Sequence, residues 1–157
     1  MTKIQLISVL FTAFALFGCG SSSYPDAQVS ELDKLDEIRD TYYAAKGNDI
    51  AQDRACKSFD DHVASMNQID GWVAEVSKVN SLLGDRWVEL ELDDYSFKMW
   101  PEEDSTWGST GIDLGMITVG EAYHFSGTVR KEMSFTCSGK MRNPEIQIEP
   151  SAMQRHF

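Results

Sequence analysis

Basic residues are scarce in this sequence. Its 157 residues include 14 Lys and Arg against 25 Asp and Glu, a formal net charge of −11, and no segment gathers Lys or Arg among aromatic residues. Affinity for a phosphate backbone comes mainly from Lys and Arg that neutralise phosphates, so we expect no nucleic acid among the partners. If the negative charge is functional, it favours a cationic partner.

The motifs that mark many enzymes are also absent. The sequence has no G-x-S-x-G, no glycine-rich phosphate loop and no paired CxxC. His62 lies on a predicted helix, His124 has no acid or nucleophile spaced beside it, and His156 lies in the tail. The acidic residues at 93–94 and 102–104 lack the ligand spacing of an EF-hand. We therefore expect no enzyme, no catalytic residue, no metal and no cofactor.

Long apolar runs are missing except at the N-terminus. Residues 4–17 are almost all apolar, whereas a membrane-spanning helix needs about 20 apolar residues, so residues 1–18 are predicted to be a signal peptide. Leu16-Phe17-Gly18-Cys19 resembles the bacterial lipobox, which implies that Cys19 is acylated, with palmitate among its chains. An ordinary signal peptide cut nearby is the alternative.

The residues after Cys19 are small and polar, and residues 19–27 are predicted to form a lipidated, flexible tether. Gly20, with no acidic residue beside the cysteine, resembles lipoproteins sorted to the outer membrane. We expect the domain to be anchored there through its acyl chains and to face the periplasm.

Cysteine is rare. With Cys19 acylated, Cys56 and Cys137 are the two that remain, in a compartment that permits disulfides. We predict that they are bonded, which for so long a loop stabilises by about 4 kcal/mol in the chain-entropy model. Two free, buried thiols are the alternative.

Residues 28–67 have the apolar period of two helices. Gly47-Asn48-Asp49 marks a turn between them. The second helix has an apolar stripe at spacings of three or four, made of Cys56, Phe59, Val63 and Met66. We predict a helical hairpin that turns Cys56 toward the core.

Residues 68–150 alternate between apolar and polar, as strands do. The predicted strands cover residues 72–77, 86–93, 96–100, 121–130, 133–137 and 144–148. A loop at 101–111 and a short helical or irregular connector at 112–120 separate the third strand from the fourth, in which Gly127 marks a bulge or bend. Residues 151–157 are predicted to be a tail.

Three successive strands, a connector and closing strands follow the order of the five-stranded OB barrel. The residues that also resemble a family are Gly71-Trp72-Val73, Arg86-Trp87-Val88-Glu89-Leu90, Val119-Gly120-Glu121, Phe125-Ser126-Gly127-Thr128, Ser134-Phe135-Thr136, Gly139-Lys140-Met141 and Asn143-Pro144-Glu145-Ile146. They look like the tRNA-anti-like OB-fold domains of bacterial lipoproteins and envelope proteins. The expected fold is α+β, an N-terminal helical hairpin packed on a five- to six-stranded OB-type β-barrel.

OB barrels bind ligands on the face of strands 2 and 3 and on the adjoining loops. The residues expected there are Glu89, Glu91, Lys98 and Trp100, with Tyr95 and Trp107 on flanking loops. Such an acidic, aromatic surface fits a cationic peptide, a basic protein or a glycan. The alternative is that the Glu side chains are solvated strand positions and the tryptophans are packing residues.

Three functions are compatible with these observations. The first is a lipid-anchored binding or assembly module with an OB-like domain. The second is a structural accessory lipoprotein of an envelope complex, and the third is an acidic inhibitor or exclusion factor for a cationic envelope-active protein.

Overall fold

The computed structural model describes residues 24–82, 85–101, 107–130 and 136–157. The predicted signal peptide, the predicted acylation site Cys19 and the first part of the predicted tether lie outside these ranges. In the part of the chain that is described, no helix is long and apolar enough to cross a membrane.

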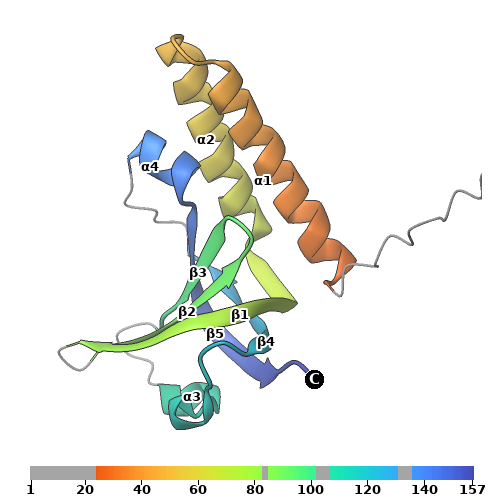
Figure 1. The fold of residues 1–157 in the computed structure, drawn as a ribbon, viewed down its shortest axis with the longest axis vertical. Helices are drawn as coiled ribbons and strands as arrows, with labels where there is room; N and C mark the ends of the chain where they lie inside the picture. Colours follow the sequence, from red (N-terminus) through yellow and green to blue (C-terminus); the bar gives the residue numbers. More distant parts are fainter. Residues whose placement is uncertain (1–23, 83–84, 102–106, 131–135) are drawn as a thin grey trace, which may run out of the picture.

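Two antiparallel helices stand on one end of a sheet (Figure 1). Helix α1 covers Asp26–Ala44 and α2 covers Asp49–Met66. Asn48 caps α2, because its side-chain oxygen accepts from the Ala51 N–H at 3.1 Å. The inward faces of the helices, with Phe59 and Val63, belong to the same buried cluster as the sheet interior. The predicted helical hairpin is confirmed.

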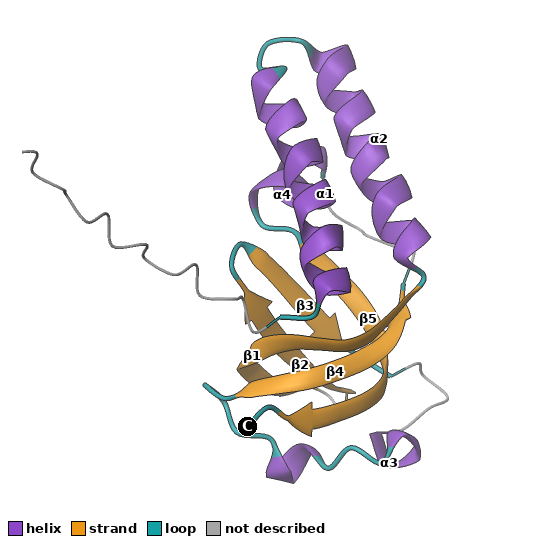
Figure 2. Cartoon of the chain, turned by 90° about the vertical axis from the view of Figure 1, so that its right-hand side faces the viewer, coloured by secondary structure: helices purple, strands orange, loops and turns teal. Residues whose placement is uncertain are grey.

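The strands are β1 (Gln68–Leu82), β2 (Asp85–Leu92), β3 (Tyr95–Met99), β4 (Ala122–Val129) and β5 (Glu145–Arg155). They form one closed sheet in the order β1-β2-β3-β5-β4, in which β3–β5 is parallel and the other pairs are antiparallel. Strand β1 pairs first with β4 and then with β2, so one long strand serves two neighbours. The fold is therefore α+β, with helices packed on a closed five-stranded sheet (Figure 2).

The last strand is longer than predicted. Residues expected to form a tail from 151 continue β5 to Arg155 and pair with β4, as in Phe125 opposite Met153. The prediction of a tail was wrong because this stretch is held by backbone pairing, while most of its side chains are exposed and show no apolar alternation. Gly127 does lie at a register irregularity with β5, and a Cβ there would collide with the Glu149 carbonyl oxygen.

Short helices replace some of the predicted extended structure. Cys137 begins helix α4 (Cys137–Arg142), whereas we predicted that it ends a strand over 133–137, of which residues 133–135 lie outside the described ranges. Thr136 caps α4 by accepting from the Gly139 N–H at 3.3 Å. Helix α3 (Trp107–Thr110) and the 3₁₀ turn η1 (Leu114–Met116) connect β3 to β4 at the end of the sheet away from the hairpin (Figure 2).

Candidate functional site

The junction between the hairpin and the sheet is cross-linked. Cys56 on α2 and Cys137 at the start of α4 form a disulfide with a Cα–Cα distance of 5.7 Å, as predicted. One turn further along both helices, the Lys140 ammonium donates to both carboxylate oxygens of Asp60, at 2.8 and 2.7 Å. Two adjacent links therefore hold α4, and through it β5, against α2.

Helix α1 is fixed to the same assembly by buried and partly buried hydrogen bonds. The Gln28 amide accepts from the Val73 N–H at 2.8 Å and donates to the Val73 carbonyl at 2.7 Å, so it pairs with β1 as a strand would. Arg39 and Tyr43 both donate to the Met141 carbonyl, at 3.1 and 2.9 Å. These contacts fix the position of the hairpin on the sheet.

Four of the predicted ligand-face residues share the outer surface of β2 and β3. Glu89 lies opposite Lys98, Glu91 lies opposite Ser96, and Trp100 follows β3 directly. Residues of the opposite parity on both strands are buried in the core. Alternation along the two strands therefore places these four side chains on one face, as the sequence indicated.

The centre of this outer face is an aromatic pair, of which Trp100 was predicted from the sequence and Trp87 was not. The Trp87 and Trp100 rings stack with centroids 5.9 Å apart and an interplanar angle of 25°. The Lys98 ammonium lies 4.8 Å from the Trp87 centroid and 4.9 Å from that of Trp100, a cation–π contact to both. Trp87 Nε1 donates to Glu89 at 2.7 Å. The sequence could have predicted Trp87 on this face, because in the alternation along β2 it has the same parity as Glu89 and Glu91.

Tyr95 and Trp107 do not lie on this face. Tyr95 is the first residue of β3 and is buried, and its hydroxyl donates to Asp36 at 2.7 Å; burial raises its pKa above the usual range. Trp107 is 8% exposed at the start of α3 and donates from Nε1 to the Arg86 carbonyl at 2.7 Å. The predicted placement of both residues on loops that flank this face was wrong, since each side chain is buried and hydrogen-bonded within the fold.

Two histidines that seemed isolated in the sequence are neighbours. His156 Nδ1 lies 2.8 Å from His124 Nε2, and His124 Nδ1 lies 3.2 Å from the Gly71 carbonyl. Pairing of β5 with β4 brings them together. Within the described ranges, no group of three or more His, Cys, Asp or Glu side chains is arranged to hold a metal ion.

Comparison with known proteins adds little. No family model matches the sequence, and no curated protein matches it significantly. One similar solved structure is that of a Replication Protein A heterotrimer bound to ssDNA, with 16% sequence identity over 58% of this chain and 58% of that chain and a TM-score of 0.34. We infer neither fold nor ligand from a match at this level.

Proposed function

We propose that this chain is an envelope lipoprotein, anchored through acylated Cys19, whose domain is an OB-type binding module for a saccharide. The ligand surface is the outer face of β2 and β3, with Trp87, Lys98 and Trp100 at its centre. The stacked tryptophans on that face are the observation that carries the proposal.

The OB-type description is supported by the topology. Strands β1, β2 and β3 follow one another as a meander, β5 closes the sheet by pairing in parallel with β3, and β1 is shared between β2 and β4. The same order was expected from the sequence, and OB barrels bind ligands on the face that carries the tryptophans here.

A saccharide fits the chemistry of this face better than a cation does. Indole rings supply broad apolar surfaces, and their cation-binding position is already taken by the Lys98 ammonium. Hydrogen-bonding groups surround the rings: Asn80 donates to Glu89 at 2.9 Å, and Gln147 lies opposite Lys98 on β5. Apolar rings edged by a few oriented polar groups are the usual composition of a small-molecule site.

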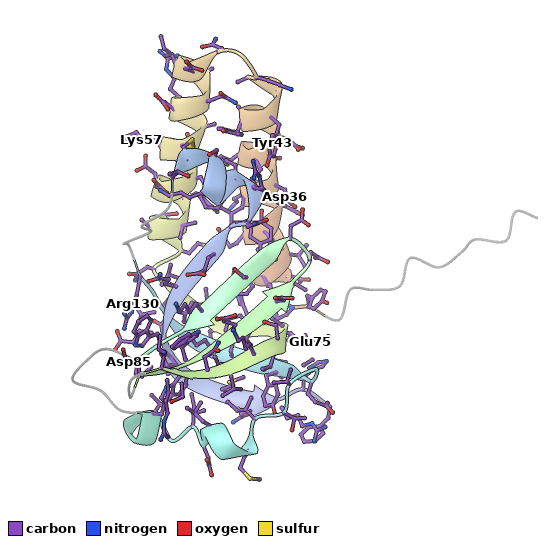
Figure 3. The ribbon with its side chains drawn as sticks, turned by 60° about the vertical axis from the view of Figure 1, so that its left-hand side comes forward. Asp36, Tyr43, Lys57, Glu75, Asp85 and Arg130 are labelled. Atoms are coloured by element: carbon purple, nitrogen blue, oxygen red, sulfur yellow. A yellow bond between two sulfur atoms is a disulfide. The ribbon has the colours of Figure 1, made fainter. Side chains whose placement is uncertain are left out.

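Arg130 adds a buried donor beside the same face. Its Nη2 donates to the Trp100 carbonyl at 2.9 Å, while its buried Nε has no acceptor within the described residues. Figure 3 shows Arg130 beside the strands, on the same side of the molecule as Asp85 at the start of β2. A ligand hydroxyl or carboxylate would satisfy such a donor.

The test is a glycan array of bacterial envelope saccharides, followed by calorimetric titration of the best binder. Trp87→Ala and Trp100→Ala are expected to weaken binding about tenfold or more, since stacking on one ring contributes about 1–3 kcal/mol in nucleotide sites, where it has been measured. The matched control is Phe157→Ala, which removes a fully exposed aromatic ring at the opposite end of β5. Absence of binding to every saccharide, or equal loss in the control, would overturn the proposed ligand.

The anchor is tested separately. Cys19→Ser is expected to abolish incorporation of radiolabelled palmitate and to release the protein from the membrane fraction. Retention of the variant in membranes washed with high salt would contradict the lipid anchor and leave the saccharide proposal intact.

A further inference from the structure

A groove of about 270 Å³ lies between the first half of α1 and the turn that joins β2 to β3. Its apolar lining includes Val29 and Leu32 from α1 and Leu92 from the end of β2. Asp33 on the helix and Asp93 on the turn also line it, and both side chains are exposed. The groove therefore combines an apolar surface with carboxylates contributed by two different elements.

The chain itself binds a cation beside this groove. The Arg39 guanidinium donates to Asp36 at 3.1 Å and to Asp94 at 3.2 Å, and its carbon lies 5.3 Å from the centroid of the Tyr95 ring. Figure 3 shows Asp36 on α1 above the turn between β2 and β3. Asp36, Asp94 and Tyr95 all line the groove, so its architecture binds a basic side chain between a helix carboxylate, a turn carboxylate and an aromatic ring.

Asp33 and Asp93 likewise come from the helix and from the turn, and both line the groove. Over the described ranges, neither carboxylate lies within ion-pair distance of a basic side chain. Their charges add to a chain with a net charge of −11, which attracts positively charged partners and speeds their association.

We propose that this groove binds a basic peptide segment of a partner protein, with an aliphatic side chain on the apolar surface and flanking Lys or Arg side chains at Asp33 and Asp93. The carboxylates select positive charge, and Val29, Leu32 and Leu92 select an apolar neighbour. Burial of that apolar side chain supplies affinity that survives salt, whereas the exposed ion pairs are screened over about 8 Å at physiological ionic strength.

This site is distinct from the tryptophan face, by which we mean the outer face of β2 and β3 that carries Trp87 and Trp100. Trp87 lies near the start of β2 and the groove at its end, roughly 17 Å away along the strand at about 3.4 Å per residue. The two proposals therefore fail independently: a peptide that binds equally well to Trp87→Ala and wild type uses the groove, whatever the saccharide result.

The probe is a fluorescein-labelled Gly-Lys-Leu-Lys-Gly peptide, with Gly-Lys-Ser-Lys-Gly and Gly-Glu-Leu-Glu-Gly as comparison peptides, titrated by anisotropy. The test variant is Asp33→Asn with Asp93→Asn; Asn also tolerates the positive φ of 51° at position 93. The matched control is Asp40→Asn with Asp53→Asn, which removes the same charge from exposed positions elsewhere on the hairpin.

We expect saturable binding of the Lys-Leu-Lys peptide, about tenfold weaker in the test variant and nearly unchanged in the control, since the test variant loses two exposed ion pairs with the peptide, each of modest strength. The Ser peptide should bind more weakly and the Glu peptide not at all. Equal weakening in both double variants would mean general charge attraction and overturn the site. Equal affinity of the Leu and Ser peptides, or full competition by spermidine at matched charge, would overturn a peptide ligand in favour of a simple polycation.

Discussion

The hairpin junction and the tryptophan face differ in how far their polar side chains are buried and in where the partners of those side chains lie in the sequence. At the junction, the Gln28 amide is fully buried and the Lys140 side chain is 10% exposed, and each meets a specific partner in another element. On the face, Trp87, Lys98 and Trp100 are half-buried and contact one another across neighbouring strands. Partners at the junction are far apart in sequence, whereas those on the face lie within one strand pair.

This difference separates stability from recognition. A buried polar group whose partner is removed loses a hydrogen bond and stays out of water, which is costly. A half-buried residue on a strand surface can be changed at a smaller cost, because water replaces what is lost. Substitutions at the junction should therefore lower the free energy of unfolding, and substitutions on the face should mainly change binding.

The largest expected effect is at the disulfide. Cys56→Ala with Cys137→Ala removes a link across 81 residues, and the free energy of unfolding should fall by about 4 kcal/mol. Urea denaturation of the wild type with and without dithiothreitol measures the same difference without mutation. An unchanged midpoint after complete reduction, verified by mass, would mean that the junction does not depend on this bond.

The next effect is at Gln28. Gln28→Ala leaves the buried N–H and carbonyl of Val73 without their partner, and at about 1–3 kcal/mol per unsatisfied group the variant should lose about 3 kcal/mol. Gln52→Ala is the matched control, since its amide makes one long contact of 3.5 Å to the Tyr42 carbonyl. If chemical denaturation gives the same loss of unfolding free energy for Gln28→Ala and Gln52→Ala, α1 is not fixed through Val73.

A smaller effect depends on pH. Burial raises the pKa of Tyr95, so above about pH 10 the unfolded chain releases a proton that the folded chain retains. The stabilisation is complete below the ordinary tyrosine pKa and is lost as the pH rises, by at most about 1.4 kcal/mol per pH unit. The free energy of unfolding, measured from pH 8 to 11, should fall with this slope in the wild type and less steeply in Tyr95→Phe. Parallel pH curves for the two proteins would contradict a role of Tyr95.

Regular periodicity explains most of what the sequence predicted. The apolar stripes gave both helices, and alternation placed Glu89 and Lys98 together on the outer face. The same alternation, extended backwards from Phe97 and Met99, would have turned Tyr95 inward. The predicted strand began one residue later, at residue 96, which left Tyr95 on a loop.

Other features leave no periodic signal. Trp107 lies in a segment without alternation, and its burial depends on the Arg86 carbonyl, 21 residues earlier in the chain. The pairing of residues after 150 with β4 is a backbone interaction, and the contact between His124 and His156 follows from it. The groove forms only because the hairpin docks beside the turn after Leu92.

The central claim is that the tryptophan face, and not the junction, receives the saccharide. The most direct test is a ¹H–¹⁵N correlation spectrum of the labelled protein, titrated with the best binder from the array. We predict saturable shifts of the Trp87 and Trp100 indole N–H signals and of the Lys98 and Gln147 amides, with the amides of Val73 and Cys137 unmoved. Shifts centred on the junction, or indole signals that stay fixed at saturation, would contradict the account.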